Sequence, residues 1–263
     1  ILFSGNLSDK LRYDLDPSDN EMKGIHRELP STPCRSGNSR VNNKQDKFPK
    51  KGSLEISENR AKAMHFFANH ELMAIEMMAA AILYLPEKNE VDKKIKLGIA
   101  QTIKDEQKHF FLYQRRFQEL GVEFGDFSIN DFFWRYYQKV QNLQEYFALV
   151  ALTFESANLD FSRYYMNCFH EFEDKLSAHV MREVYEDEIS HVALGASYLK
   201  RSVPEKDLWK YYCENLPSGV SPARGKGMQF DKEGRVRSGL GQDFIQKQES
   251  FIDDFPVVNR KNT

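Results

Sequence analysis

The chain is short of cysteine, of long apolar runs and of any large excess of one charge. Its 263 residues include three cysteines, whose spacing fits neither a metal-binding motif nor a disulfide framework. The most apolar run, Met73 to Leu85, is interrupted by Glu76 and is shorter than the roughly 20 residues that span a membrane. The first residues lack the basic-then-apolar pattern of a secretion signal. These features predict a cytoplasmic protein that has no membrane partner.

Charge and composition divide the chain into three zones. Residues 1–51 carry a net charge of +3 and residues 204–263 carry +1, and both zones are punctuated by proline and glycine, which prevent long helices. Because the whole chain has a charge of −2, residues 52–203 carry −6. We therefore expect an irregular extension over residues 1–56, a helical domain over 57–203, and an irregular extension over 204–263 that wraps the helices.

The middle zone predicts an all-α fold of four helices, at about 57–85, 91–120, 136–169 and 172–201. Ser57 is expected in the N-cap region of the first helix, which stops at Pro86. The second helix ends at Gly121, a residue suited to the position after a helix. A segment from about Val122 to Trp134 then crosses to the third helix. Short turns join the helices into two antiparallel hairpins.

One short pattern occurs twice. Asp105-Glu106-Gln-Lys-His109 and Asp187-Glu188-Ile-Ser-His191 each place glutamate and histidine three residues apart. On a helix these side chains leave the same face one turn apart, so they can converge on one metal ion. A single pair would be ordinary helix surface. Two copies in long helical patterns predict a four-helix bundle with two metals in its core.

The remaining ligands follow from height along the hairpins. In an antiparallel pair, residues equally far from the turn lie at the same level, since each residue rises about 1.5 Å. This places Glu71 opposite Glu106, and Glu155 opposite Glu188, at separations of 35 and 33 residues. The near-equal separations indicate an internal repeat of two hairpins. The predicted metal ligands are Glu71, Glu106, His109, Glu155, Glu188 and His191.

The ligand types favour two divalent ions. Carboxylates in apolar helix faces cost several kcal/mol each unless a cation compensates them. Four carboxylates and two neutral imidazoles balance two divalent ions, and oxygen and imidazole donors without thiolate suit iron or manganese. Glu76 and His70 are rivals to Glu71 for the place on the first helix.

Two aspartates next to the predicted ligands are candidates for a supporting role. A metal-bound imidazole usually donates its other N–H to a carboxylate, which fixes the ring. Asp105 is expected to reach His191 on the facing helix, and Asp187 to reach His109. The alternative is that both aspartates are ordinary surface carboxylates.

The ligand pattern resembles the ferritin-like di-iron carboxylate superfamily, in which Glu, Glu-x-x-His, Glu and Glu-x-x-His lie on four successive helices. The resemblance implies the same six ligands. Within that superfamily, several stretches between about residues 57 and 245 look like the uncharacterised family called domain of unknown function 455. These stretches are Asn69–Glu76, Asp105–Phe110, Gly125–Asp131, Thr153–Asp160, Asp187–Val192, Ser221–Phe230 and Gly239–Leu240.

The resemblance implies two iron ions, or manganese or a mixed pair, with dioxygen as co-substrate. The expected reaction hydroxylates or oxidises a small, apolar organic substrate in a monomer or dimer, and the electron donor is not indicated. The alternatives are iron storage, a helical binding protein that retains the site, and a tRNA-modifying hydroxylase. In the last case Lys44 to Lys51 would contact phosphate, although the net charge of −2 disfavours nucleic acid. The expected walls of a substrate channel are Phe67, Ile75, Ile103, Leu152, Leu159 and Tyr185.

Overall fold

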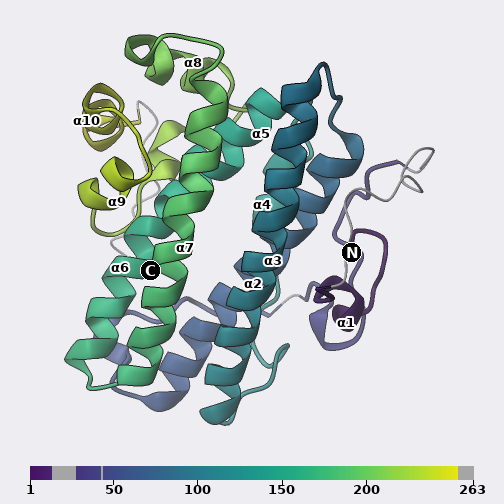
Figure 1. Ribbon diagram of the computed structural model, residues 1–263. Coiled ribbons are helices and arrows are strands. Elements are labelled where there is room, and N and C mark those ends of the chain that lie inside the picture. The colour runs from purple at the N-terminus through teal and green to yellow at the C-terminus, as the bar shows by residue number, and fades with distance from the viewer. Residues whose placement is uncertain (14–27, 43, 254–263) are drawn as a thin grey trace. The chain divides into compact units, whose positions relative to one another are not determined.

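The computed structural model describes residues 1–13, 28–42 and 44–253, and over these residues it is helical and has no strand. Its longest helices are α2 (Ser57–Tyr84), α3 (Glu90–Glu119), α6 (Ser156–Glu171) and α7 (Lys175–Leu199) (Figure 1). The chain forms two compact units. Unit 1 comprises residues 1–143 and 165–184, and unit 2 comprises residues 144–164 and 185 onward. The predicted all-α class is therefore confirmed for the described residues, and the three-zone division stays a prediction.

Helices α2 and α3 form an antiparallel hairpin in unit 1, and local signals set its turn. Leu85 ends α2 in an extended conformation (φ −76°, ψ 134°), because the residue before a proline is sterically disfavoured in the helical region. The Nζ atom of Lys96 donates to the carbonyl oxygens of Ile82 (2.8 Å) and Leu85 (2.7 Å). A lysine on α3 thus satisfies carbonyl groups that the last turn of α2 leaves without helical partners.

The other helix ends agree with the sequence only in part. Asn89 caps α3 by accepting a hydrogen bond from the backbone N–H of Asp92 (3.0 Å). Gly121 follows α3 with a positive φ of 82°, as predicted. At the start of α2 the prediction was wrong by one residue, because Ile56 occupies the N-cap position and Ser57 is already helical. The apolar side chain of Ile56 makes no capping hydrogen bond.

The four long helices meet within unit 1 through aromatic packing. The ring of Phe67 on α2 stacks on Tyr113 of α3 at 5.5 Å between centroids and meets Tyr165 of α6 edge-on at 5.4 Å. The hydroxyl of Tyr113 donates to the sulfur of Met181 on α7 over 3.8 Å. Aromatic pairs of this kind contribute about 0.5–1.5 kcal/mol beyond their buried area. The two hairpins are therefore packed together at this level of unit 1.

Asp174 fastens the turn between α6 and α7 to the α2–α3 hairpin. It caps α7 by accepting from the backbone N–H of Ser177 (3.0 Å), and it forms ion pairs with Arg116 of α3 (3.0 Å) and Arg60 of α2 (2.9 Å). Burial acts to raise the pKa of Asp174, but the hydrogen bonds from Ser177 and the charge of Arg116 outweigh it and hold the pKa below its ordinary value. The carboxylate therefore stays charged in this turn.

The third predicted helix differs most from the structure. Instead of one helix from 136 to 169 there is a short helix α4 (Phe132–Tyr137), then α5 (Leu143–Leu149), a π-helical stretch (Val150–Glu155) and α6. Trp134 gives a physical reason for the separate α4. It is fully buried, and its indole N–H donates to the carbonyl oxygen of Pro30 over 3.1 Å. This contact holds α4 against the amino-terminal segment of unit 1.

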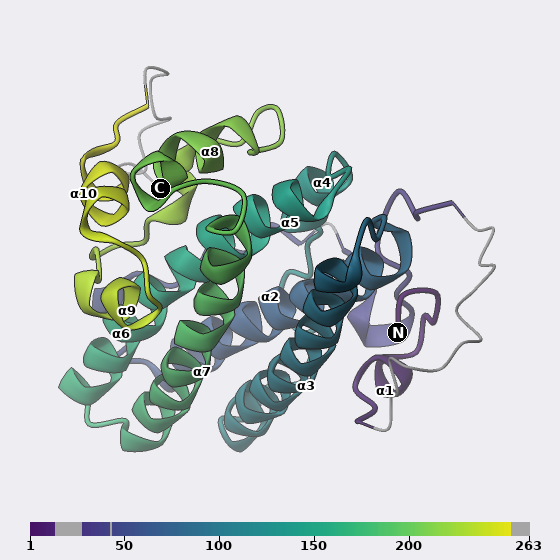
Figure 2. The ribbon, with the colours of Figure 1, turned by 45° about the horizontal axis from the view of Figure 1, so that its top comes forward.

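The carboxyl-terminal zone of unit 2 is more regular than expected. It contains α8 (Leu208–Glu214), α9 (Lys232–Arg237) and α10 (Gln242–Ser250), of which Figure 2 shows α9 beside α6. Phe244 packs against Trp209 and Tyr212, each at 5.4 Å between centroids. The described part of this zone, which the sequence predicted to be irregular, thus contains three short helices. Residues 14–27 and 43 of the predicted amino-terminal extension, and 254–263 of the carboxyl-terminal one, lie outside the described residues.

Helix α2 is long and apolar enough to cross a membrane by length and composition alone. However, 83% of its most apolar window is buried inside the protein, and the helix also carries Glu71 and Glu76 at buried positions. This combination is typical of the core helix of a soluble protein. The predicted cytoplasmic location stays a prediction.

Candidate metal centre

The two Glu-x-x-His motifs adopt the same local geometry. Glu106 and His109 lie one turn apart on α3, both fully buried, with 3.2 Å between Glu106 Oε2 and His109 Nδ1. On α7 the same two atoms of Glu188 and His191 are also 3.2 Å apart. In both motifs the ring nitrogen that faces the glutamate is Nδ1, and its role as donor or acceptor depends on the tautomer of the ring. The repeat read from the sequence therefore recurs as repeated geometry.

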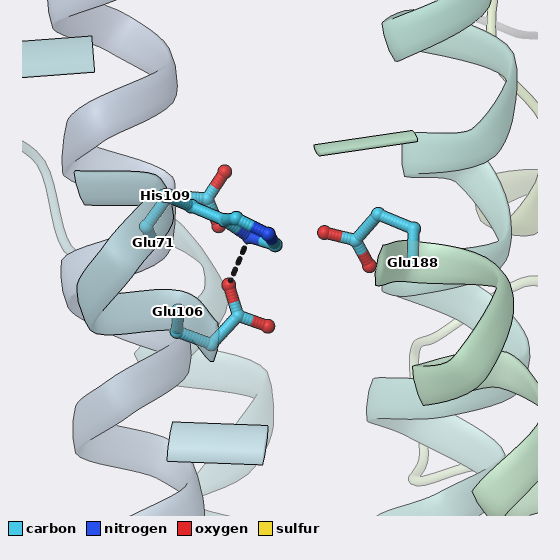
Figure 3. Close-up of side chains that lie close together, drawn as sticks. All are labelled: Glu71, Glu106, His109 and Glu188. Carbon is cyan, nitrogen blue, oxygen red and sulfur yellow. Dashed lines mark hydrogen bonds and ion pairs between the residues drawn. The ribbon is translucent and has the colours of Figure 1, made fainter. Parts of the chain in front are cut away.

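A third residue joins the motif in each unit. Within unit 1, Glu71 of α2 lies beside Glu106 and His109, and within unit 2, Glu155 lies beside Glu188 and His191. Two overlapping groups could hold a metal ion, and within each group the ligand atoms lie within 4.8 Å of one another. All members are buried, and Figure 3 draws the first group. The groups are Glu71, Glu106, His109 and Glu188, and Glu106, Glu155, Glu188 and His191.

Electrostatics favours a cation at these clusters. Two carboxylates whose oxygens lie within 4.8 Å of each other repel each other by at least about 3 kcal/mol at an effective dielectric constant of about 20. Such pairs occur among the buried glutamates, so a bound cation would stabilise the cluster. Oxygen and imidazole donors at this spacing fit a divalent transition metal. Buried Glu and His clusters that could hold a metal ion are thus present among the described residues.

Asn158 is a site residue that the sequence reasoning missed. Its side-chain Nδ2 donates to Oε1 of Glu188 over 2.9 Å, and its own Oδ1 lies 3.5 Å from the hydroxyl of Ser162. Asn158 follows Glu155 by three residues on the same helix face. A polar residue one turn from a predicted ligand is the signal that could have identified it.

The π-helical stretch was also missed, and Glu155 is its last residue. Within it, the hydroxyl of Thr153 donates to the carbonyl oxygen of Ala148, five residues earlier, over 2.8 Å. Single π-helical turns inside α-helices occur often at functional sites. The stretch changes the direction in which Glu155 leaves the helix relative to a regular α-helix.

The rivals to Glu71 are placed elsewhere. Glu76 is fully buried in ion pairs with Arg35 (2.7 Å) and Lys10 (3.0 Å). Burial lowers the pKa of His70 to about 4, and its ring packs against Phe133 at 4.9 Å. Among the described residues, neither Glu76 nor His70 belongs to a candidate metal group.

Two other sequence predictions stay predictions. Asp105 and Asp187 are half-buried, and their contacts with His191 and His109 stay predictions. The residues predicted to wall a substrate channel are all buried, which a packed core would also require. These residues are Phe67, Ile75, Ile103, Leu152, Leu159 and Tyr185.

Fold and clusters together define an all-helical protein with buried glutamate and histidine side chains that could hold a metal ion. Residues 6–246 match the model of the family described as "Protein of unknown function (DUF455)", and the chain belongs to that family. No curated protein and no solved structure matches the chain. The resemblance to domain of unknown function 455 is thus confirmed, and the family description names no activity.

Proposed function

We propose that this protein is a ferritin-like di-metal carboxylate oxidoreductase that uses dioxygen to hydroxylate or oxidise an organic substrate. The observation that carries the proposal is the repeated cluster of buried ligands: Glu71 lies with Glu106 and His109 in unit 1, and Glu155 lies with Glu188 and His191 in unit 2. Each cluster offers carboxylate and imidazole donors that would hold a divalent metal ion. Glu71 and His109 would complete one metal position, and Glu155 and His191 the other.

The order of the ligands along the helices supports the ferritin-like architecture. Glu71 lies on α2, the first Glu-x-x-His on α3, Glu155 at the junction of the π-helical stretch with α6, and the second Glu-x-x-His on α7. Short turns join α2 to α3 and α6 to α7, whereas a longer segment with α4 and α5 connects the hairpins. This order matches the pattern of carboxylate-bridged di-metal bundles.

Iron is the proposed metal, with manganese or a mixed pair as alternatives. Bound iron would supply the electrons that reduce dioxygen and the oxidising power that acts on the substrate. The chain contributes carboxylates, which are hard donors suited to iron and manganese, and a buried setting that excludes bulk water. An external electron donor is part of the proposal because such an oxidation consumes two electrons besides those taken from the substrate.

The experiment that tests the proposal begins with metal content. Metal-free protein reconstituted anaerobically with ferrous iron should bind two ions per chain, and Glu106→Ala and His191→Ala should lower this number. Glu90→Gln, an exposed position on α3, is the matched control and should leave it unchanged. Failure of the unaltered protein to bind iron or manganese would refute the metal centre.

Admission of dioxygen then separates the enzyme from iron storage. We expect an absorbance change at two irons per chain without growth of a ferric mineral, in a monomer or dimer by size-exclusion chromatography. A large shell that accumulates many irons per chain would favour storage. Oxidation of a bound tRNA, with no effect on small apolar compounds, would favour the tRNA-modifying alternative.

A further inference from the structure

We propose that the carboxyl-terminal segment, residues 225–248, is a structural part of the metal centre. In this assignment Gln248 and Arg235 act as positioning residues for Glu155, because they hold the backbone of the π-helical stretch that ends in this glutamate. The inference rests on the proposed function and adds to it residues far along the chain from any ligand. All the contacts that support it lie within unit 2.

A π-helical turn creates a need for hydrogen-bond partners. In an α-helix each carbonyl accepts from the N–H four residues later, and where the pairing changes to five residues some carbonyls lose that partner. Buried carbonyls must then be satisfied by other groups. The carbonyl oxygen of Leu152 accepts from Nε2 of Gln248 (3.3 Å), and that of Ser156 from Nη2 of Arg235 (3.0 Å). These two carbonyls flank Glu155.

A third contact holds the start of the same stretch. The hydroxyl of Thr153 donates to the carbonyl oxygen of Ala148 and lies 2.8 Å from the hydroxyl of Tyr212 on α8. Tyr212 is fully buried against the aromatic core of the carboxyl-terminal helices. The π-helical stretch is thus tied to this zone on both sides of Glu155.

The two positioning residues are themselves rigidly held. Arg235 is fully buried and forms an ion pair with the fully buried Asp160 (2.5 Å). The Nε atom of Arg235 donates to Oε1 of Gln248 over 2.8 Å, and its Nη2 also donates to the carbonyl oxygen of Gly225 (2.8 Å). Because charged, bidentate hydrogen bonds are short and directional, this network fixes both side chains in one geometry.

The backbone around Gly225 and Gly227 packs closely against the π-helical stretch and α6. A Cβ atom on Gly225 would lie 3.2 Å from the carbonyl oxygen of Leu152 and 2.6 Å from Nε2 of Gln248. A Cβ atom on Gly227 would lie 2.6 Å from Cβ of Asp160. Only glycine allows the segment to press so closely on the helix.

The hydrogen bonds from Gln248 and Arg235 support only one of the two ligand clusters, the one that contains Glu155. Glu71 lies in the interior of the uninterrupted α-helix α2, where the helical hydrogen bonds alone fix the backbone. Glu155 lies at a π-helical turn whose geometry depends on Gln248, Arg235 and Thr153. Loss of these hydrogen bonds should therefore lower the metal affinity of the position that contains Glu155 and His191. The affinity of the position that contains Glu71 and His109 should not change.

Gln248→Glu is the sharpest variant. The glutamate keeps an acceptor for Arg235 but replaces the donor to the Leu152 carbonyl with an oxygen that repels it. The matched control is Gln246→Glu, the same change at an exposed position on α10. Titration of metal-free protein with Mn²⁺, followed by electron paramagnetic resonance of the free ion, gives the number of bound ions and their two binding constants.

We expect the unaltered protein and Gln246→Glu to bind two ions, and Gln248→Glu to bind one normally and the second about 10- to 100-fold more weakly. Hydrogen exchange of the metal-free protein should rise over residues 148–158 and not within α2. If Gln248→Glu bound both ions as tightly as the unaltered protein, or lost affinity for both equally, the positioning role of Gln248 would be refuted. The proposed metal centre would still stand. An unaltered protein that binds no Mn²⁺ would overturn the proposed function itself.

A second pair of variants keeps the test available if Gln248→Glu does not fold. Thr153→Val removes the hydroxyl that bridges Ala148 and Tyr212, whereas Thr153→Ser keeps it. We expect the valine variant to lose affinity at one position and the serine variant to restore it. Equal affinities in both variants would overturn the inference.

Discussion

The side-chain amide of Asn158 donates a hydrogen bond to Oε1 of Glu188 over 2.9 Å, while Oε2 of Glu188 lies 3.2 Å from Nδ1 of His191. Both carboxylate oxygens of Glu188 are thus oriented by neighbours in unit 2. In the other half of the repeat, the residue three positions after Glu71 is Ala74, which has no hydrogen-bonding side chain. The first half of the repeat therefore has no counterpart to Asn158 at this position.

This difference predicts a selective effect of Asn158→Ala. Loss of the amide donor frees one oxygen of Glu188 to rotate, so ordering it on a metal costs more conformational entropy. We expect metal affinity to fall about 10- to 100-fold, the usual cost of removing a group that orients a ligand. Isothermal titration with Mn²⁺ measures the change. Asn167→Ala, at an exposed position on the same helix, should bind like the unaltered protein, and equal binding by both variants would contradict the role of Asn158.

Substitution of Glu76 is expected to lower the stability of the fold without changing metal binding. Its carboxylate compensates Arg35 and Lys10, whose charged groups are fully buried. Glu76→Gln leaves two buried cations beside a neutral amide, so we expect a loss of about 3–5 kcal/mol in the free energy of unfolding. Urea denaturation measures that loss.

The matched comparison for Glu76→Gln is Glu71→Gln on the same helix. We expect Glu76→Gln to keep two metal ions per chain at temperatures where it is folded, and Glu71→Gln to bind fewer. If the two variants lost metal equally, Glu76 would belong to the metal centre and Glu71 would lose its distinct assignment.

His65 predicts a pH dependence of stability. Burial, partly offset by Asp126, lowers its pKa from 6.5 to about 4, and its Nε2 accepts a hydrogen bond from the backbone N–H of Gly125 (2.9 Å). The folded protein therefore holds His65 neutral, whereas the unfolded chain binds a proton below pH 6.5. Neutral His65 therefore makes its full contribution to the free energy of unfolding above pH 6.5. This contribution falls by up to about 3 kcal/mol as the pH falls toward 4.

His65→Gln isolates this contribution. The glutamine can still accept from Gly125 but does not titrate, so the stability advantage of the unaltered protein should shrink between pH 6.5 and 4. Urea denaturation at several pH values measures the difference between the two proteins. A difference that does not change over this range would show that His65 is charged in the folded protein.

Local signals in the sequence predicted the parts of the fold that depend on near neighbours. Pro86 and Gly121 fixed where α2 and α3 end, because each acts on its own backbone. The spacing of Glu and His predicted their shared helix face, and equal height along a hairpin pointed to Glu71 and Glu155. Each of these inferences needs only helix geometry.

Features that depend on distant contacts were not predictable. The separate helix α4 is held by the bond from Trp134 to Pro30, 104 residues away. The π-helical stretch is satisfied by Gln248, which lies 96 residues after Leu152. The local sequence does not indicate such distant hydrogen-bond partners. The short helices of the carboxyl-terminal zone span too few turns to give a clear period, so their proline and glycine content suggested irregular structure.

Asp105 and Asp187 directly precede the two glutamates of the motifs. Each is half-buried, and each is expected to accept the second N–H of the histidine on the facing helix: Asp105 from His191, and Asp187 from His109. A carboxylate in this position fixes the ring and increases its basicity toward a metal.

Asp105→Asn and Asp187→Asn keep the size of the side chain but remove its charge, so each should weaken metal binding about 10- to 100-fold. Asp243→Asn, on the exposed side of α10, is the control. Unchanged Mn²⁺ affinity in both variants would assign the aspartates to the solvated surface, and a crystal structure of the metal-bound protein would locate their carboxylates directly.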